Sequence, residues 1–421
     1  MSPRTERARL DRLPFTAIAA LFAAAFAASL LSCSERPLPQ VFVWDAVSQA
    51  VLIENSALTA VAAISRDEAI AVGYATPKGA GFSHSTSFHR AGPRWTEVIV
   101  PAPAHTGSNS LLAAVRAPDG SVWACGSVRQ LQDEPSTAQP IVYRYAGGLW
   151  TEVSLAEVGD LLGSELDAIA VSGIGPGLEV RAVGTTLGEG LALRFAGGHW
   201  SRMPLATSSP FAKSWGLAAV GRAPSGLWYA AGSRLDAPGG AIFADSGRGW
   251  RQLIGPAGPA LYSTALAFDA EGDLWLAGNT FDGDSLQGVL YHHRAGAFVA
   301  VSITRRSGGS YRLLGLGFDA VGHGWAVGGR TPDDPFFAGL QGDHWVETVA
   351  EREHELGPPP PGEQGGEIFT VSVVALDVAF AAGQTEEIGH EGEPEVAPRL
   401  FELRARPVGE RDALRPAPDD R

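Results

Sequence analysis

Cysteine, lysine and long hydrophobic runs are scarce in this chain of 421 residues, and each shortage excludes a class of protein. The two cysteines, Cys33 and Cys125, allow one disulfide at most, so a small disulfide-stapled domain is excluded. Lysine occurs only at Lys78 and Lys213, and the net charge is −14. An acidic surface without a basic stripe repels phosphate backbones, so we expect no nucleic-acid partner.

Signatures of common enzyme classes are missing too. The chain has no G-x-S-x-G nucleophile turn and no P-loop, and His354-Glu355 lacks the second histidine of a zinc-binding helix. After Cys33 no stretch shows helical periodicity, and no run is long and apolar enough to span a membrane. Hydrophobic residues still make up 45% of the chain, enough for a substantial core, and 52 glycines with 29 prolines indicate many short turns.

An arginine-rich start followed by an apolar run from Leu13 to Leu31 has the layout of a secretory signal. The end of this run, Leu30-Leu31-Ser32-Cys33, resembles the bacterial lipobox. The resemblance implies that residues 1–32 are a signal peptide and that Cys33 carries acyl chains such as palmitate. The alternative is an uncleaved anchor helix, because about 19 apolar residues can just cross a bilayer.

Either reading predicts a membrane-attached protein outside the cytoplasm, in the bacterial cell envelope. We expect the outer membrane, with the chain facing the periplasm or the surface. Several acyl chains anchor a protein stably, because each buried methylene contributes about 0.8 kcal/mol. With Cys33 lipidated, Cys125 has no disulfide partner. Its apolar surroundings, VWACG, predict a buried and inert thiol rather than a nucleophile.

An internal repeat of about 52 residues organises the rest of the chain. A glycine that ends a short apolar stretch recurs at Gly73, Gly126, Gly184, Gly232, Gly278, Gly328 and Gly383. Nine of the eleven tryptophans fall into two registers of this repeat. The first register holds Trp123, Trp228, Trp275 and Trp325, and the second holds Trp95, Trp150, Trp200, Trp250 and Trp345, with Phe298 in the fifth repeat. Only Trp44 and Trp215 lie outside this pattern.

Each repeat resolves into four short strands separated by turn residues such as Gly-Gly, which suit β-hairpins. Such repeats are typical of β-propeller blades, and a linear β-solenoid is the alternative. The seventh repeat lacks a fourth strand with a tryptophan, whereas residues 40–54 are strand-like and belong to no repeat. We therefore predict an all-β, seven-bladed β-propeller of four-stranded antiparallel blades, closed by an N-terminal strand. It spans residues 40–405, between a lipidated tether (33–39) and a disordered tail (406–421).

The stretch Asp269–Gly278 reads D-x-x-G-x-hydrophobic-W-x-x-G. This pattern resembles the propeller repeats in periplasmic sensor regions of bacterial regulators and, more distantly, the Asp-box of sialidase-like propellers. The resemblance covers most of the mature chain but concerns architecture. The FRIP-type arginine motif of sialidases is missing, and in full sialidases the Asp-box joins the third and fourth strands, whereas this turn joins the first and second.

Several acidic and histidine residues are candidates for a metal site. Asp119, Asp269 and Asp319 recur at turns, where we interpret each carboxylate as a cap for backbone N–H groups rather than a cation ligand. Asp282 and Asp284 could begin a calcium loop, but the distal bidentate glutamate is missing. His292 and His293 are adjacent on a strand and point to opposite faces, so they cannot share a metal. We expect no metal, no cofactor and no catalytic residue.

Two segments of the seventh repeat, 351–367 and 384–398, are predicted to be long loops. The second holds five glutamates, Glu386, Glu387, Glu391, Glu393 and Glu395. We interpret this charge as solvated surface, with recruitment of a basic partner or divalent cations as the alternative. The sequence therefore favours a non-enzymatic binding scaffold for an envelope protein, peptide or glycan. The alternative function is a carbohydrate-active hydrolase or lyase of the propeller type.

Overall fold

The computed structural model describes the strands of the repeats and most of their turns. The described residues are 40–46, 56–77, 79–103, 107–130, 137–206, 215–234, 239–245, 247, 249–253, 261–282, 285–305, 309–330, 334–348, 350–351, 363–375, 377–388 and 394–407. The chain divides into two compact units, residues 1–41 with 405–421 and residues 42–404. The architecture given below is that of the second unit. No helix in the described ranges is long and apolar enough to cross a membrane.

Seven sheets, each with four antiparallel strands, form the blades, which confirms the predicted all-β propeller. Blade 1 contains β2 (Ser56–Ala63), β3 (Glu68–Ala75), β4 (His84–Ala91) and β5 (Arg94–Glu97). Blade 2 contains β6 (Ser108–Arg116), β7 (Val122–Arg129), β8 (Ala138–Ala146) and β9 (Leu149–Glu152). Blade 3 contains β10 (Ser164–Ser172), β11 (Glu179–Thr186), β12 (Glu189–Ala196) and β13 (His199–Arg202). Two short 3-10 helices, η2 (Ala156–Val158) and η3 (Gly175–Gly177), lie in the connections around β10.

The remaining blades follow the same order, and three of them gain a short fifth strand. Blade 4 contains β15 (Trp215–Arg222), β16 (Trp228–Arg234), β17 (Gly240–Asp245), β18 (Trp250–Gln252) and the added β14 (Leu205–Ala206). Blade 5 contains β19 (Leu261–Phe268), β20 (Leu274–Asp282), β21 (Ser285–Arg294) and β22 (Ala297–Val301). Blade 6 contains β24 (Tyr311–Phe318), β25 (Gly324–Arg330), β26 (Asp334–Gln341), β27 (His344–Thr348) and the added β23 (Ile303–Thr304). Blade 7 contains β29 (Glu363–Ala375), β30 (Val378–Ile388), β31 (Pro394–Pro407), β1 (Gln40–Ala46) and the added β28 (Ala350–Glu351).

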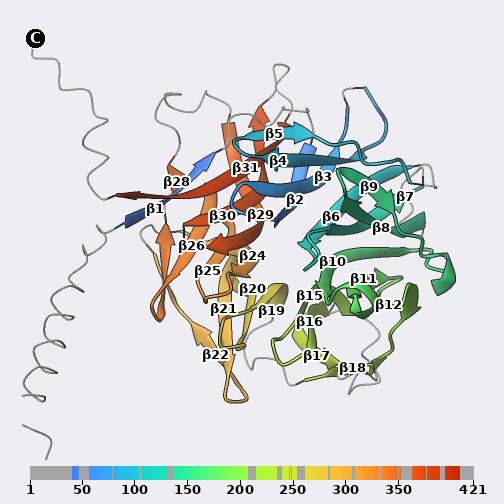
Figure 1. The fold of residues 1–421 in the computed structure, drawn as a ribbon. Coiled ribbons are helices and arrows are strands. Elements are labelled where there is room, and N and C mark those ends of the chain that lie inside the picture. The colour runs from blue at the N-terminus through green and yellow to red at the C-terminus, as the bar shows by residue number, and fades with distance from the viewer. Residues whose placement is uncertain are drawn as a thin grey trace, which may run out of the picture. The chain divides into compact units, whose positions relative to one another are not determined.

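The innermost strand of each blade contacts the innermost strand of the next, so the series closes into a ring. The contacts run in the order β2, β6, β10, β15, β19, β24, β29 and back to β2. The N-terminal strand β1 hydrogen-bonds β31 of the last blade, and Figure 1 shows the two strands side by side. The predicted closure by an N-terminal strand is therefore confirmed.

The repeated glycine is required by a β-bulge in the innermost strand. In blade 2, Gly126 pairs with Leu111, and the register of β6 against β7 shifts between Leu111 and Ala113. The bulge brings the carbonyl oxygen of Ser110 so close to Gly126 that any Cβ there would overlap it. The same register shift lies opposite the repeat glycine in every blade. The recurring glycines of the sequence therefore mark the positions opposite the bulges.

The tryptophan registers report the packing between blades. The buried hydrophobic residues of the described chain form seven clusters, and each cluster combines residues of two neighbouring blades. The second-register tryptophan of a blade packs against the blade before it, as Trp150 does beside Ile70 and Trp200 beside Cys125. Phe298 takes this position in the cluster between blades 4 and 5. The core is thus a ring of interfaces rather than one centre.

Trp44 belongs to the second tryptophan register, which corrects its placement outside the pattern. Each added strand runs parallel to a tryptophan-bearing outer strand, and Leu205 pairs with Trp250 while Ile303 pairs with Trp345. In blade 7, Ala350 pairs with Trp44 in the same way. Trp44 is fully buried, stacks on Phe337 with ring centroids 4.6 Å apart and meets Trp325 edge-on at 5.2 Å. The signal was available in the sequence as the missing tryptophan of the seventh repeat.

The acidic segment 384–398 is mostly paired strand rather than the long loop predicted. The pairing of β30 with β31 continues from Gln384 opposite Pro398 to Ile388 opposite Pro394. Residues 389–393, which include Glu391 and Glu393, lie outside the described residues, as do the side chains of Glu386, Glu387 and Glu395. The other predicted loop, 351–367, is described only at its ends, in β28 and β29.

Candidate functional site

One end of the ring carries the short turns of all the blades. In a four-stranded antiparallel blade, the connection between the first and second strands lies at the same end as that between the third and fourth. We call this end the turn face. The connections between second and third strands, and those between blades, lie at the opposite end. The turn aspartates Asp119, Asp269 and Asp319 and one groove lie on the turn face.

The three turn aspartates accept hydrogen bonds from backbone N–H groups, which confirms their interpretation as turn caps. Asp119 Oδ1 accepts from Ser121 at 3.0 Å, and Asp269 Oδ1 accepts from the backbone of Asp273 at 2.9 Å. Asp319 Oδ1 accepts two such bonds, one of them from His323 at 2.9 Å. The three are not in one register, however. Asp269 and Asp319 begin their turns, whereas Asp119 lies two residues beyond Ala117, which occupies the corresponding position.

A groove of about 470 Å³ lies on the turn face between blades 2 and 3. Blade 2 contributes Trp123, Arg144 and Thr151, and blade 3 contributes Phe195 with the Gly197–Gly198 turn. The aromatic rings of Trp123 and Phe195 lie 5.5 Å apart and are tilted by 50°. The sequence marked Trp123 only as a repeat residue, because Arg144 reaches it through the pairing of β7 with β8 and Phe195 reaches it through the packing of neighbouring blades.

Arg144 brings a positive charge to an otherwise apolar wall. Its guanidinium lies 5.7 Å from the centre of the Trp123 ring and bonds Asp119 Oδ2 at 2.8 Å. Burial alone would raise the pKa of Asp119, but hydrogen bonds from Ser121 and the charge of Arg144 lower the pKa below its usual value. The carboxylate thus holds Arg144 in place, while 39% of the arginine side chain remains exposed.

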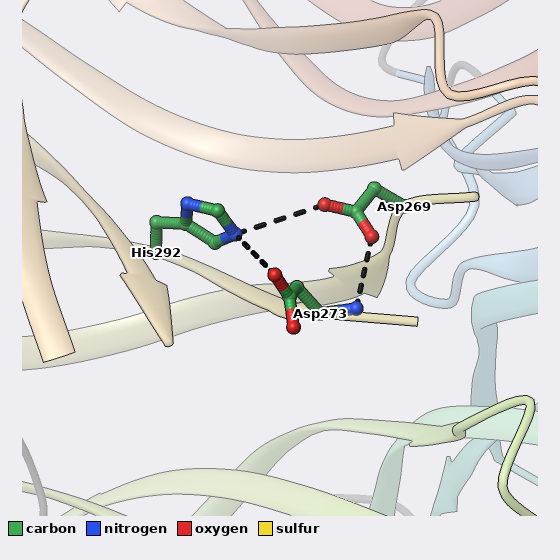
Figure 2. A group of neighbouring side chains, drawn as sticks. All are labelled: Asp269, Asp273 and His292. Atoms are coloured by element: carbon green, nitrogen blue, oxygen red, sulfur yellow. Dashed lines mark hydrogen bonds and ion pairs between the residues drawn. The ribbon is translucent and has the colours of Figure 1, made fainter. Parts of the chain in front are cut away.

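Blade 5 carries a different set of side chains at the corresponding place. Trp275 corresponds to Trp123, and His292, which pairs with it across the strands, corresponds to Arg144. The imidazole of His292 stacks on Trp275 with centroids 4.0 Å apart and 9° between the planes. Its Nε2 lies 3.7 Å from Asp269 Oδ2 and 3.4 Å from Asp273 Oδ2. Figure 2 shows the imidazole facing both carboxylates. The three ligand atoms of His292, Asp269 and Asp273 lie within 4.8 Å of one another.

The innermost strand of blade 3 holds a carboxyl group with a raised pKa. Asp167 lies at the bulge of β10, between Leu166 and Ala168. Burial and, secondarily, the charge of Glu165 raise the pKa of Asp167 to about 7, against the opposing effect of Arg129. Arg129 pairs with Glu165 across the junction of blades 2 and 3, at 3.1 Å. No sequence signal marked Asp167, since its raised pKa depends on burial in the folded chain.

The other candidate residues have separate positions. His293 contacts Phe298 at 4.5 Å on the face opposite His292, as predicted. Cys125 is fully buried, its sulfur lies 3.8 Å from the Leu166 carbonyl, and burial raises the pKa of the thiol well above its usual range. Cys33 and Asp284 lie outside the described residues, and of Asp282 only the backbone is described.

The chain is similar to solved propeller structures. No family model matches it, and no curated protein matches it in sequence. YCF48 bound to the D1 peptide has a TM-score of 0.55 at 15% identity, over 89% of this chain and 98% of that chain. An ulvan lyase, a polysaccharide lyase, has a TM-score of 0.51 at 9% identity, over 87% of this chain and 100% of that chain. At such identities the similarity shows the propeller fold alone.

Proposed function

We propose that this chain is a lipid-anchored extracytoplasmic β-propeller that acts as a non-enzymatic scaffold and binds an envelope protein, peptide or glycan. The observation that carries the proposal is the groove between blades 2 and 3. Its volume of about 470 Å³ falls within the range of about 300–1,000 Å³ typical of ligand pockets. It joins two aromatic rings to one partly exposed guanidinium, a combination enriched where proteins bind their partners.

The lining indicates which part of a partner would enter. The ring of Phe195, half-buried above Trp123, offers an apolar surface for a sugar ring or an aliphatic side chain. Arg144 can donate two parallel hydrogen bonds to a carboxylate, which both acidic peptides and uronic acids carry. Gly197 and Gly198 form the adjoining turn, where their positive φ angles favour glycine, and because neither carries a side chain a ligand can approach the backbone.

The solved structures of similar fold support a binding role from two directions. YCF48 was solved with a peptide, and the ulvan lyase was also solved with a GlcA–Rha3S segment, at a TM-score of 0.50 to this chain. The lipid anchor rests on the lipobox-like residues 30–33. An anchored ring would present its faces to the envelope, where peptides and acidic glycans are both available.

The test fills the groove with a new side chain and leaves the ion pair between Arg144 and Asp119 intact. Thr151 lies exposed on β9, directly opposite Arg144, so Thr151→Trp should fill the groove. We expect this variant to lose partners that the parent chain captures by cross-linking in its native envelope, and to stop co-sedimenting with purified sacculi. The matched control is Thr96→Trp, at the same place in blade 1, opposite His89 and outside the groove.

Retention of every cross-linked partner and of sacculus binding by Thr151→Trp would refute the groove as the binding site. Equal loss in Thr151→Trp and Thr96→Trp would refute it as well, because the effect would then come from surface tryptophan. The expected pattern is loss in Thr151→Trp alone.

A second candidate function, a carbohydrate-active hydrolase or lyase, is favoured by Asp167. A carboxyl group with a pKa of about 7 is suited to act as a general base or acid near neutral pH. Glu165 and Arg129 supply the second carboxylate and the cation that a polysaccharide site would use. Assay of uronic-acid polysaccharides with the parent chain and Asp167→Asn decides this: activity lost in Asp167→Asn supports it, and no activity in the parent chain refutes it.

A further inference from the structure

We propose that Asp269, Asp273 and His292 bind one zinc ion on the turn face of blade 5 and leave its fourth coordination position open. This site goes beyond the binding groove of blades 2 and 3, from which blade 4 separates it along the chain. Two of its residues come from the turn between β19 and β20, and the third comes from β21 (Figure 2). The sequence-based interpretation expected no metal here, because it treated Asp269 as a turn cap and considered His292 only together with His293, with which it cannot share a metal.

The distances from His292 Nε2 to the two carboxylate oxygens fit a tetrahedral ion. Zinc bonds of about 2.0–2.2 Å to nitrogen and oxygen place neighbouring tetrahedral ligands about 3.4 Å apart. His292 Nε2 lies 3.4 Å from Asp273 Oδ2 and 3.7 Å from Asp269 Oδ2. Neither separation is short enough for a strong hydrogen bond, yet both allow an ion between the atoms. Calcium would require six to eight oxygen ligands, which three residues including an imidazole do not supply.

The buried nitrogen of His292 has no hydrogen-bond partner. Its Nε2 is inaccessible to solvent and unsatisfied, although two carboxylate oxygens face it. Leaving a buried polar atom unpaired is costly, so an unpaired nitrogen that points at two carboxylates indicates a missing ligand. This observation is independent of the clustering of acidic groups.

Equivalent positions in other blades are satisfied without an ion. In blade 2 the position of His292 is held by Arg144, which pairs directly with Asp119 at 2.8 Å. In blade 6, His323 bonds Asp319 at 2.6 Å, and in blade 1, His89 contacts Glu68 at 3.1 Å. Blade 5 alone among these places two aspartates and one histidine together without such a bond, so a divalent cation would balance their charge.

The ligands are held in position before any ion arrives. Asp269 Oδ1 accepts from the backbone of Asp273 at 2.9 Å, and Asp269 Oδ2 accepts from Trp275 Nε1 at 2.8 Å. The ring of His292 is fixed by its stack on Trp275. Hydrogen bonds and packing of this kind orient metal ligands and raise affinity. Trp275, a repeat residue, thus supports both the blade interface and the site.

The site is open toward solvent on the side of Asp273. The side chains of Asp269, His292 and Asp273 are 9%, 19% and 32% exposed, in that order. Arg294 is the nearest cation, with its Nε 3.6 Å from Asp273 Oδ2, and its side chain is 75% exposed. Such a contact is weak and leaves room for an ion. Three protein ligands with one open position are typical of zinc sites that bind water or another ligand oxygen.

The test measures zinc binding by calorimetry, with ZnCl₂ as titrant. The full-length chain is solubilised in detergent, purified without a histidine tag and stripped with EDTA. We expect one ion per chain and a rise of the unfolding temperature with zinc. His292→Phe keeps the stack on Trp275 but removes the nitrogen, and Asp273→Asn keeps the shape of the more exposed ligand. Each substitution should lower the affinity for zinc by more than the roughly 10–100-fold that loss of a supporting hydrogen bond costs.

The matched control is His89→Phe, which removes the histidine at the same place in blade 1 and should bind zinc like the parent chain. Cobalt(II) in place of zinc should give the visible absorption of a tetrahedral site in the parent chain, and not in Asp273→Asn. Failure of the parent chain to bind zinc would overturn the proposal. Equal binding by the parent, His292→Phe and Asp273→Asn, or tighter binding of CaCl₂ than of ZnCl₂, would overturn it too.

Discussion

Arg90 and Glu402, 312 residues apart in the chain, form a buried two-bond ion pair between the first and last blades. Arg90 Nε donates to Glu402 Oε1 at 2.7 Å and a second guanidinium nitrogen donates to Oε2 at 3.1 Å. Both side chains are only 9% exposed. Trp95 Nε1 donates to the same carboxylate at 3.3 Å, and the guanidinium lies 5.0 Å from the ring of Phe380. The seam of the ring thus contains a buried charge pair.

Breaking this pair on one side should destabilise the ring. In Glu402→Gln the Arg90 guanidinium loses its counter-charge while remaining buried, which typically costs about 3–5 kcal/mol. We expect a loss of that size in the free energy of unfolding, measured by urea denaturation. The double variant Arg90→Leu with Glu402→Leu should recover most of the loss, because it leaves no unpaired charge. Equal losses in the single and double variants would contradict this.

Removal of the Trp44 side chain should destabilise the last blade from its outer strand, at the interface with blade 6. Trp44 is fully buried between blades 6 and 7, so Trp44→Ala should cost about 3–5 kcal/mol of unfolding free energy. Deleting residues 36–54 removes all of β1 and should prevent stable folding. The control is Leu149→Ala, whose side chain is 71% exposed and should change stability by less than about 0.5 kcal/mol. A deletion variant that melts like the parent would refute closure by β1.

The fold could be predicted because the repeat carries its own structural requirements. The glycines mark bulges where no Cβ fits, and the tryptophans mark the contacts between blades, so both recur at fixed places. The prediction failed for single blades. Trp44 looked isolated because its blade is assembled from the two chain ends. Asp119 looked equivalent to Asp269 although it lies two residues further along a turn of the same length. Which strands pair at the closure of the ring, and which turn residues correspond between blades, depends on backbone pairing that the spacing of residues along the chain does not show.

A repeat glycine should tolerate no side chain. In Gly126→Ala the new Cβ would meet the backbone of Ser110 and Leu111, which cannot move without disturbing the bulge. We expect a loss of at least about 2 kcal/mol in the free energy of unfolding, by chemical denaturation. The matched control is Gly81→Ala, where a Cβ meets no atom within 4 Å and no positive φ is involved. Similar unfolding midpoints for the two variants would disprove the bulge requirement.

Asp167 should make the fold less stable as pH rises. Its folded pKa of about 7 lies above the unfolded value of about 3.9, so the native state holds the proton more tightly. The contribution is fully present below about pH 4 and is lost as pH rises through 7, with a limit of about 4 kcal/mol. Asp167→Asn keeps the neutral form, so it should gain stability over the parent at pH 8 and lose most of that gain at pH 5. Urea denaturation at both values measures the difference.

Asp377 serves as a control, because its effect on stability should change with pH in the opposite direction to that of Asp167. A hydrogen bond and the charge of Arg66 lower the pKa of Asp377, against the effect of burial. Its stabilisation is therefore present above the unfolded pKa and lost as pH falls through the folded value. Asp377→Asn should differ from the parent at pH 8 in the destabilising direction, and the difference should shrink toward acid. The same sign of pH dependence in both variants would contradict the assignment of Asp167.

The candidate sites were harder to predict than the fold, because each depends on tertiary contacts. Arg144 and Phe195 lie on neighbouring blades and form a groove only when the blades pack. His292 reaches Asp269 and Asp273 across the pairing of β20 with β21, a relation that the sequence spacing of 19 to 23 residues conceals. The raised pKa of Asp167 arises from burial, which a sequence pattern does not reveal. Repeat residues can be recognised by recurrence, whereas binding residues lie where the repeats differ.

Lipid attachment at Cys33 is the central claim of the proposed function, and fractionation of labelled cells tests it most directly. Cells that express the parent chain or Cys33→Ala are labelled with palmitate and separated into membrane and soluble envelope fractions. We predict that the parent chain carries label and sediments with membranes, and that Cys33→Ala is unlabelled and soluble outside the cytoplasm. Unlabelled parent chain, or equal sedimentation of both chains with the membranes, would contradict the anchor.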